Sequence, residues 1–304
     1  MNRAIRNLEI VLPERYAVER VVADNKFMSA MLAHDIETGE PVFAKVRNPA
    51  TDHLAPLRVA NEADISGSLD HRRIPKFRDA DPEASHPWII TDFVKVDFVE
   101  TGGKKVPAVE RRLKEVVDPL LAAELMASAA EVLEYIHSQR IVHGDIKPGN
   151  LLMTQEETTI TDYDVAQRVG EETLNGVPLA IDEVLVTLEY ASPEQIRGET
   201  ALDGRSDIYS LGRVLQFFLS GESPVNHVNA NEQTVLCMLA DETRTGREVP
   251  DGLMEIVEKA LQKAPDNRFQ SAGEMAERLR RWIRDKTHAN GSGSTAQGEV
   301  SIVA

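Results

Sequence analysis

The sequence predicts an α+β protein with two unequal lobes, a small sheet-rich lobe followed by a larger, mainly helical one. Three observations predict this fold class. Short runs with strand character fill the first third of the chain, and helical patterns fill most of the remainder. In addition, 304 residues provide enough chain for two compact units at about 150 residues each.

The small lobe is predicted from runs of residues that are typical of strands. One helical pattern, at 56–69, interrupts these runs, and Glu37-Thr38-Gly39-Glu40 supplies the turn between two of them. The predicted strands are 16–22, 28–35, 41–46 and 88–94. Together these elements make a sheet with one helix beside it.

The large lobe is predicted from the helical spacing of apolar residues. The stretch 120–138 repeats apolar side chains with the period of a helix that faces a core. The stretch 208–219 is nearly all apolar and predicts a largely buried helix, and two further helices are predicted at 253–263 and 272–285. From His288 the chain is rich in Gly and Ser and lacks a periodic face, which predicts a disordered tail or linker.

The composition excludes several classes of protein. The 34 Lys and Arg against 50 Asp and Glu give a net charge of −16, which argues against a nucleic-acid binder. The single cysteine, Cys237, excludes an internal disulfide framework and is compatible with a reducing compartment. No signal peptide is apparent, and no apolar stretch approaches the roughly 18 residues of a membrane span. We therefore expect a soluble, cytoplasmic protein.

The segment 143–150, which reads His-Gly-Asp-Ile-Lys-Pro-Gly-Asn, is the most informative part of the chain. It places Asp145, Lys147 and Asn150 on one tight loop between a helix and a strand pair. Phosphoryl transfer needs a carboxylate for the proton of an attacking hydroxyl, a cation near the moving phosphoryl group and an amide oxygen for a metal. Asp162, at the end of the next short strand, is a second acid suited to a magnesium ion that bridges phosphates.

Two upstream residues extend this set. Lys45 ends a strand, and Glu62 lies in the helix that follows. A lysine held by a glutamate from a neighbouring helix can bind nucleotide phosphates without swinging away. Each residue alone would commonly be a solvated surface residue. Their order, together with the loop residues, at the joints of the expected strands and helices favours a phosphoryl-transfer site.

In these motifs the sequence resembles the Hanks-type (eukaryotic-like) protein kinases, most of all bacterial serine/threonine kinases. The resemblance implies the bilobal protein-kinase fold, in which a small antiparallel-sheet N-lobe carries helix C and the larger C-lobe is mainly helical. It also implies ATP and Mg²⁺ as cofactors. The implied limits are 1–15 for an N-terminal extension, 16–94 for the N-lobe and hinge, 95–285 for the C-lobe and 286–304 for a disordered tail or linker.

The resemblance assigns chemical roles to particular residues of this sequence. Six of them would act on the phosphates or the attacking hydroxyl: Asp145 as catalytic base, Lys147 at the transferred phosphate, Lys45 with its helix-C partner Glu62 at the nucleotide phosphates, and Asn150 and Asp162 as magnesium ligands. Others would hold adenine: the hinge backbone from Asp92 to Val94, with Ala44 and Leu152 packed on the ring. In the activation segment, Thr187 would contact the catalytic loop, and Glu194 would pair with Arg268.

Two departures from the family pattern concern the nucleotide. The stretch 23–28 matches the glycine-rich loop but contains no glycine, which restricts the approach of its backbone to phosphates. The Asp-Phe-Gly motif reads Asp162-Tyr163-Asp164, which removes flexibility after the metal ligand. We expect Asp164 to place an additional carboxylate near the metal site.

Two further departures concern regulation. Gly144 stands where the family has an arginine that binds a phosphate on the activation loop, so we expect that switch to be absent. Ser66 stands where an apolar side chain usually packs toward Tyr163, so we expect helix C to be held less firmly. Both changes favour control by partner binding or by helix-C position.

We expect a protein serine/threonine kinase that transfers the ATP γ-phosphate to Ser or Thr hydroxyls, including its own, at a slow rate. Its partners would be protein substrates or a regulatory protein. The loop changes leave open a pseudokinase scaffold with weak or no ATP binding. A small-molecule phosphotransferase is a minor alternative, because such enzymes share His-Gly-Asp-x-x-x-x-Asn. Lys147, the segment that ends in Glu194, and Ser-Asp-Ile-Tyr-Ser-Leu-Gly at 206–212 count against it.

Overall fold

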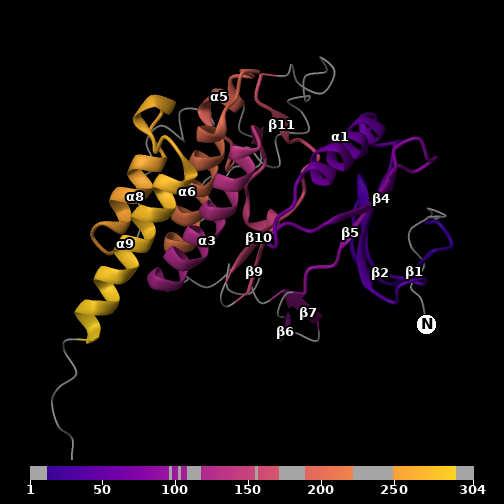
Figure 1. The fold of residues 1–304 in the computed structure, drawn as a ribbon, viewed down its shortest axis with the longest axis horizontal. Helices are drawn as coiled ribbons and strands as arrows, with labels where there is room; N and C mark the ends of the chain where they lie inside the picture. Colours follow the sequence, from indigo (N-terminus) through magenta and orange to yellow (C-terminus); the bar gives the residue numbers. More distant parts are fainter. Residues whose placement is uncertain are drawn as a thin grey trace, which may run out of the picture.

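The computed structural model confirms the two-lobed α+β fold (Figure 1). It describes residues 12–95, 98–101, 104–107, 118–154, 157–170, 189–221 and 249–291. The small lobe holds the large sheet and one helix, and the other long helices lie together in the second lobe. Among the described residues, no helix combines the length and the apolar character that a membrane span requires.

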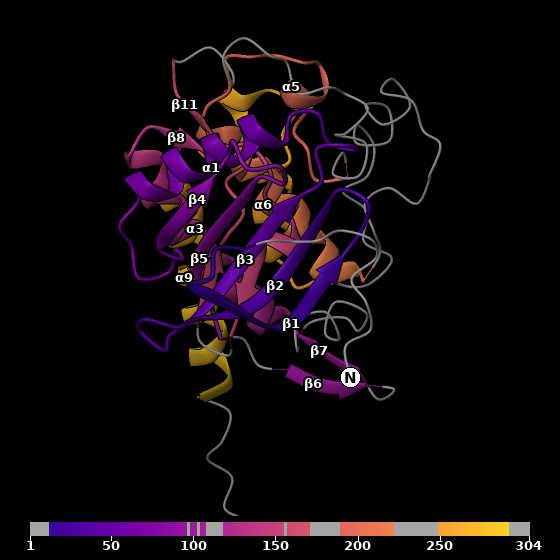
Figure 2. The same ribbon diagram turned by 90° about the vertical axis from the view of Figure 1, so that its right-hand side faces the viewer.

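The sheet of the small lobe is antiparallel and has five strands in the order β1-β2-β3-β5-β4. The strands are β1 (Tyr16–Asp24), β2 (Met28–Asp35), β3 (Pro41–Arg47), β4 (Phe77–Asp81) and β5 (Trp88–Asp92). In Figure 2, β1, β2 and β3 lie side by side in front of the helical lobe. The four predicted strands are confirmed. The edge strand β4 was not predicted because its sequence, Phe-Arg-Asp-Ala-Asp, lacks apolar alternation.

Helix α1 (Ala55–Ser68) confirms the predicted helix and packs beside β4 and β5. Its buried side includes Val59 and Ile65, but also the charged residues Arg58 and Glu62. Residues one helical turn apart share a face of a helix. The apolar contacts therefore fix which way Arg58 and Glu62 point, namely toward the sheet and the lobe junction.

Small two-stranded sheets lie at or near the junction of the lobes. They comprise β6 (Phe98–Thr101) with β7 (Lys104–Pro107), β8 (Ile141–Val142) with β11 (Gln167–Arg168), and β9 (Leu151–Met153) with β10 (Thr158–Ile160). The last two pairs flank the segment 143–150, and a short 3-10 turn, η1 (Pro148–Asn150), leads into β9. The candidate catalytic loop is thus held by a strand at each end.

The second lobe is built on helices, most of which share an apolar core. They are α3 (Pro119–Ser138), α5 (Pro193–Ile196), α6 (Gly204–Ser220), α8 (Leu253–Ala260) and α9 (Ala272–Gly291). The last helix continues past its predicted end at Asp285, so the first part of the predicted tail is helical. The limits of the N-terminal extension, lobes and tail remain predictions.

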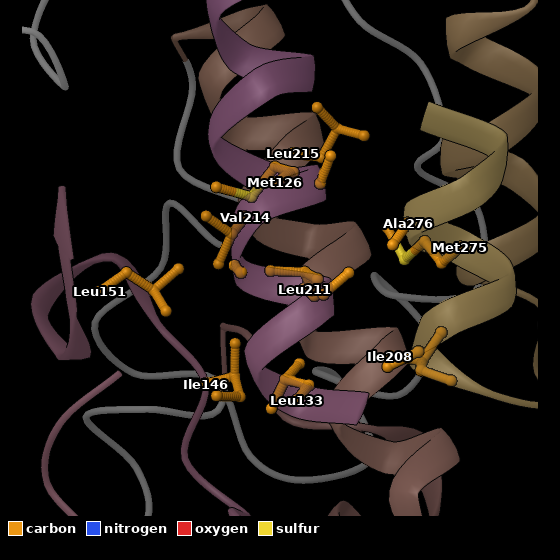
Figure 3. Packing of buried hydrophobic residues seen from close by; sticks show 14 of the residues in the cluster. Met126, Leu133, Ile146, Leu151, Ile208, Leu211, Val214, Leu215, Met275 and Ala276 are labelled. Atoms are coloured by element: carbon orange, nitrogen blue, oxygen red, sulfur yellow. The ribbon is translucent and has the colours of Figure 1, made fainter. Parts of the chain in front are cut away.

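The core of this lobe lies around α3, which is buried on more sides than its predicted single stripe. Apolar residues of α3, α6 and α9 meet there: Met126, Leu133, Ile208, Leu211, Val214, Leu215, Met275 and Ala276 (Figure 3). Ala122, Ala123 and Ala127 are also fully buried on α3. Small side chains let neighbouring backbones approach closely, which explains how one helix is covered by two others.

We predict that Gly212→Ala destabilises the protein although alanine is the better helix former. A Cβ at Gly212 of α6 would lie 2.7 Å from the Cβ of Ala260 and 3.2 Å from Leu261 Cδ2, so α6 and α8 would have to move apart. Overpacking of this kind costs about 1–3 kcal/mol, against about 1 kcal/mol gained in helix propensity. Urea unfolding should show a lower free energy of unfolding.

The matched control is Gly67→Ala in α1, where the new Cβ would meet Phe77 at an ordinary 3.7 Å. This variant should be as stable as the wild type or more stable. Equal losses of stability in the two variants would contradict the packing argument.

Candidate active site

Lys45, Glu62 and Asp162 meet where the two lobes join. Lys45 is on β3, Glu62 is on α1, and Asp162 follows β10. The Lys45 Nζ lies 2.7 Å from Glu62 Oε2 and 2.5 Å from Asp162 Oδ1. The Lys45 and Glu62 side chains are 8% and 4% exposed, whereas that of Asp162 is 27% exposed. The structure therefore brings together three residues that the sequence placed on three separate elements.

The ionisation of this triad follows from burial and charge. Burial alone would lower the pKa of Lys45, but the negative charges of Asp162 and Glu62 outweigh it and raise that pKa. Burial would raise the pKa of Asp162, and the Lys45 ammonium reverses this and lowers it. Burial raises the pKa of Glu62 to about 7, since the Lys45 ammonium only partly opposes it and the negative charges of Asp162 and Asp164 add to it. Lys45 and Asp162 are thus the firmly charged members.

The catalytic-loop residues form a second cluster between β8 and β9. Lys147 Nζ donates to Asp145 Oδ2 at 2.6 Å, and Asn150 Nδ2 donates to the same oxygen at 3.0 Å and to the Asp145 carbonyl at 2.9 Å. Burial raises the pKa of Asp145, and the Lys147 charge only partly opposes that effect. The raised pKa makes Asp145 a stronger base than an exposed aspartate.

Asp207 of α6 holds the start of this loop. Its Oδ2 accepts from the His143 amide at 2.8 Å and its Oδ1 from the Gly144 amide at 2.9 Å, and His137 Nε2 lies 2.8 Å from Oδ2. Gln195 Nε2 donates to the Gly144 carbonyl at 2.7 Å. A buried carboxylate that receives two backbone amides fixes the path of the loop ahead of Asp145.

The predicted metal ligands Asn150 and Asp162 lie beside the paired strands β9 and β10: Asn150 ends η1 directly before β9, and Asp162 follows β10. The Thr161 amide donates to the Asn150 carbonyl at 3.0 Å, which links η1 to the residue before Asp162. Asp162 has a left-handed backbone, with φ of 72°. An amide oxygen and a carboxylate are oxygen donors of the kind that magnesium takes together with phosphate and water. The donor set therefore fits a magnesium ion shared with a nucleotide.

The expectation for Asp164 is wrong in one respect. Its carboxylate is buried and binds Arg47 NH2 of β3, with Arg58 NH1 at 3.8 Å, so it is neutralised there and adds no free carboxylate at the metal site. Asn61, next to Glu62, donates to the Ala166 carbonyl at 2.9 Å. The expectation of a less firmly held helix α1, which rests on Ser66, remains a prediction, and these polar contacts of α1 and β3 count against it.

The predicted hinge residues lie at the end of β5, which stops at Asp92 instead of continuing to Val94 as predicted. The Asp92 amide donates to the Lys76 carbonyl at 2.9 Å, and its side chain binds Arg78, so β4 supports this end of β5. Val94 and Leu152 are both half-buried. Their predicted contacts with adenine remain predictions.

Ala44 does not lie where its predicted contact with adenine requires. It is fully buried in an apolar cluster with Val42 and Val46, on the face of β3 opposite Lys45. Successive strand residues point to opposite faces, so Phe43 shares the face of Lys45. Phe43 is half-buried and pairs with Thr91 of β5. Strand alternation would have identified Phe43 from the sequence.

The turn between β1 and β2 replaces the glycine-rich loop with a fixed structure. The Asn25 side-chain oxygen accepts the Phe27 amide at 2.8 Å and the Met28 amide at 3.0 Å. The Lys26 carbonyl accepts from Thr51 Oγ1 and, at 3.2 Å, from Asn48 Nδ2. Amides that bind Asn25 are not available to a phosphate, and the turn is tied to the loop before α1.

Comparison with known proteins agrees with this geometry. The family model described as protein kinase domain matches residues 16–279. The chain belongs to the protein kinase family. It is 33% identical over 278 residues to serine/threonine-protein kinase PknB of Mycolicibacterium smegmatis and 31% identical over 278 residues to PknB of Mycobacterium leprae. It is 31% identical over 282 residues to the probable serine/threonine-protein kinase SCO3848 of Streptomyces coelicolor.

The alignments cover most of this chain but less than half of its relatives. They include 87% of the chain for the two PknB proteins and 86% for the Streptomyces protein, and 42%, 42% and 39% of the respective relatives. The chain thus spans about two fifths of the length of the curated relatives it matches.

In this kinase domain Glu194 and Arg268 pair as predicted. Arg268 donates to Glu194 Oε1 at 2.6 Å and to Oε2 at 2.8 Å, and Ser206 Oγ donates to Oε1 at 2.7 Å. The Arg268 side chain is fully buried. Thr187, predicted to contact the catalytic loop, lies outside the described residues.

Sequence reasoning did not single out three residues that contact the site. Arg47 lies on the face of β3 that carries Lys45, Asn61 precedes Glu62, and Gln195 follows Glu194. In each case adjacency to an assigned residue was the available signal. Their partners could not be predicted, because those partners come from distant parts of the chain.

We predict that Asn25→Gly strengthens the binding of ATP without changing that of adenosine. The substitution frees the Phe27 and Met28 amides, and one hydrogen bond to a charged group is worth about 1.5–3 kcal/mol before the added flexibility of glycine is subtracted. The dissociation constant for ATP should fall by about threefold to tenfold in calorimetric titrations with magnesium. An equal change for adenosine, or weaker binding of ATP, would contradict this account of the turn.

We predict that Glu194→Gln lowers stability at neutral pH and that the loss shrinks in acid. Burial would raise the pKa of Glu194, but the Arg268 hydrogen bond and charge outweigh it and lower the pKa. A lowered folded-state pKa contributes stability above the unfolded value near 4.5, and this contribution is lost as the pH falls through the folded value. At pH 7 the cost should be about 1.5–3 kcal/mol.

Urea unfolding of both proteins from pH 7 down to pH 3 measures this difference. The two stabilities should converge below the unfolded pKa of a glutamate. A difference that stays constant across the range would mean that the charge of Glu194 does not contribute.

Proposed function

We propose that this domain is a serine/threonine protein kinase that transfers the ATP γ-phosphate to Ser or Thr hydroxyls, including its own. The observation that carries the proposal is the orientation of Asp145 by Lys147 and Asn150, alongside the ion-paired Lys45 and Asp162. The names of the relatives support the substrate class. We propose proteins as the partners and the cytoplasm, which supplies ATP, as the location.

In the proposed reaction Asp145 receives the proton of the attacking hydroxyl. Both of its side-chain donors bind Oδ2, so we assign Oδ1 to the substrate hydroxyl. The Lys147 ammonium, 2.6 Å from Oδ2, lies close enough to the base to offset charge on the phosphoryl group as it moves. Its role is therefore to orient Asp145 in the free protein and to contact phosphate in the complex.

ATP and Mg²⁺ are the cofactors generally used by protein kinases, and the donor set described above fits them. Asn150 and Asp162 would hold magnesium, which supplies charge neutralisation between the phosphates when bound. Lys45 would contact the phosphates while Glu62 keeps it from turning away. Lys45 Nζ and Asp162 Oδ1 are already paired at 2.5 Å. The cation for the phosphates and the carboxylate for the metal are therefore adjacent in the protein without a nucleotide.

We predict that Asp145→Asn reduces phosphate transfer by a factor of about 10² or more, because the amide accepts no proton at neutral pH. The measurement is transfer of label from γ-labelled ATP with magnesium, both to the protein itself and to a Ser/Thr-containing acceptor. The matched control is Asp251→Asn, at an exposed aspartate of the helical lobe, which should retain full activity.

Equal incorporation of label by the wild type and Asp145→Asn would refute the proposed kinase activity. If ATP still raised the melting temperature of such an inactive protein, the scaffold function would be favoured. Transfer to a small hydroxyl compound but to no protein would instead favour the phosphotransferase alternative.

A further inference from the structure

Asp164 lies at the centre of a buried cluster of two arginines and two aspartates. Arg47 of β3 binds Asp164 through NH2 and Asp52 Oδ2 through NH1 at 2.9 Å. Arg58 of α1 reaches both acids, with NE 3.5 Å from Asp52 Oδ1 and NH1 3.8 Å from Asp164 Oδ2. The four side chains are at most 10% exposed. Their charges balance, which is the condition for keeping ions inside a protein.

Asn61 adds a second contact between α1 and the same segment. Its Nδ2 lies 2.9 Å from the Ala166 carbonyl and 3.3 Å from the carbonyls of Tyr163 and Asp164. A side-chain amide that faces three backbone carbonyls fixes the path of the segment, because each carbonyl needs a donor when it is away from water. Helix α1 therefore holds this segment by a hydrogen-bonded side chain as well as by charge.

These contacts repeat the Lys45 triad a short distance along each element. Arg47 follows Lys45 by two residues on the same strand face, Asp164 follows Asp162 by two residues, and Asn61 directly precedes Glu62. Each residue of the Lys45 triad thus has a partner one or two residues away in the sequence. These partners connect the same three parts of the chain: β3, α1 and the segment after β10. A shift of α1 away from the sheet would break both sets of contacts at once.

We propose that Arg47, Asn61 and Asp164 are positioning residues that hold α1 and Asp162 where Lys45 requires them, without a phosphate on the activation segment. The proposal rests on the proposed kinase function. It gives Asp164 a definite role: the carboxylate at the family's glycine position supplies the partner of Arg47. Gly144 agrees with it, since an arginine that would bind a phosphate is absent from the catalytic loop.

The decisive variant is Asp164→Gly, which restores the glycine of the family pattern. It leaves Asp52 as the remaining acid for both Arg47 and Arg58, so that two buried arginines face one carboxylate. With phosphatase-treated protein, kcat for labelled-ATP transfer should fall by at least tenfold. Hydrogen exchange of the α1 amides should accelerate by at least tenfold. Asp164→Asn, which keeps a hydrogen-bond acceptor for Arg47, should be intermediate and guards against failure of the glycine variant to fold.

Three further variants separate positioning from general stability. Arg15→Met breaks another arginine–aspartate pair of the same lobe, in which Arg15 NH2 lies 2.6 Å from the buried Asp35 at the far end of β2. It should change neither kcat nor α1 exchange. Arg47→Met should lower kcat as Asp164→Gly does. The double variant Arg47→Met/Asp164→Gly should lose less than the sum of the two single variants, because all three lack the Arg47–Asp164 contact.

The outcomes test the positioning role of Arg47, Asn61 and Asp164 separately from the proposed kinase function. If Asp164→Gly matches or exceeds the wild-type kcat, or if α1 exchange is unchanged, the positioning role is refuted. If Arg15→Met reproduces both effects, the role is also refuted, because loss of stability then accounts for them. If the wild type transfers no phosphate, the kinase function fails, and α1 exchange together with the affinity for MgADP decides the positioning role alone.

Discussion

The shared ion pair of Lys45 is the contact on which the rest of the site depends. Burial by itself disfavours a charged lysine, so the ammonium persists only where Glu62 and Asp162 both lie within reach. This requirement links a strand, a helix and a segment from the other lobe. Pairing with Ala30 and Ile89 fixes Lys45 on β3, and apolar packing fixes the face that α1 presents. Loss of Lys45 would leave two carboxylates at the junction without their shared cation, which costs several kcal/mol.

The net charge of −16 does not describe the charge at the site, where some of the acids are paired with arginines. Counting acids suggested repulsion of a nucleotide, because Asp164 adds to Asp162. In the structure Arg47 and Arg58 take up Asp164, so the carboxylate that faces the junction and can meet a metal is Asp162. The acidic excess therefore does not by itself weaken nucleotide binding. The β1–β2 turn is the stronger restriction, since its amides already have an acceptor in Asn25.

The fold and the chemical residues could be predicted from the sequence because their signals are local or ordered along the chain. Strand runs, helical spacing and the loop that holds Asp145 are of this kind. The failures have different causes. Ala44 and Lys45 are neighbours on one strand and point to opposite faces, so local alternation contradicts the adenine role given to Ala44, and strand β4 carries charges instead of alternating apolar residues. The partners of Asp164 and Asn61 depend on contacts across about 100 residues of chain, which no local pattern encodes.

The backbone at Gly144 of the catalytic loop suits a glycine. Its backbone has φ of 77°, and a Cβ there would come within 3.3 Å of the Val165 carbonyl, so a glycine relieves a crowded joint. Asp207 binds its amide and Gln195 its carbonyl, which connects the loop to α6 and to α5. Both contacts are made within the protein and neither requires a phosphate. Together with the cluster around Asp164, these contacts connect the catalytic loop to α5 and α6, and the metal-ligand segment to β3 and α1.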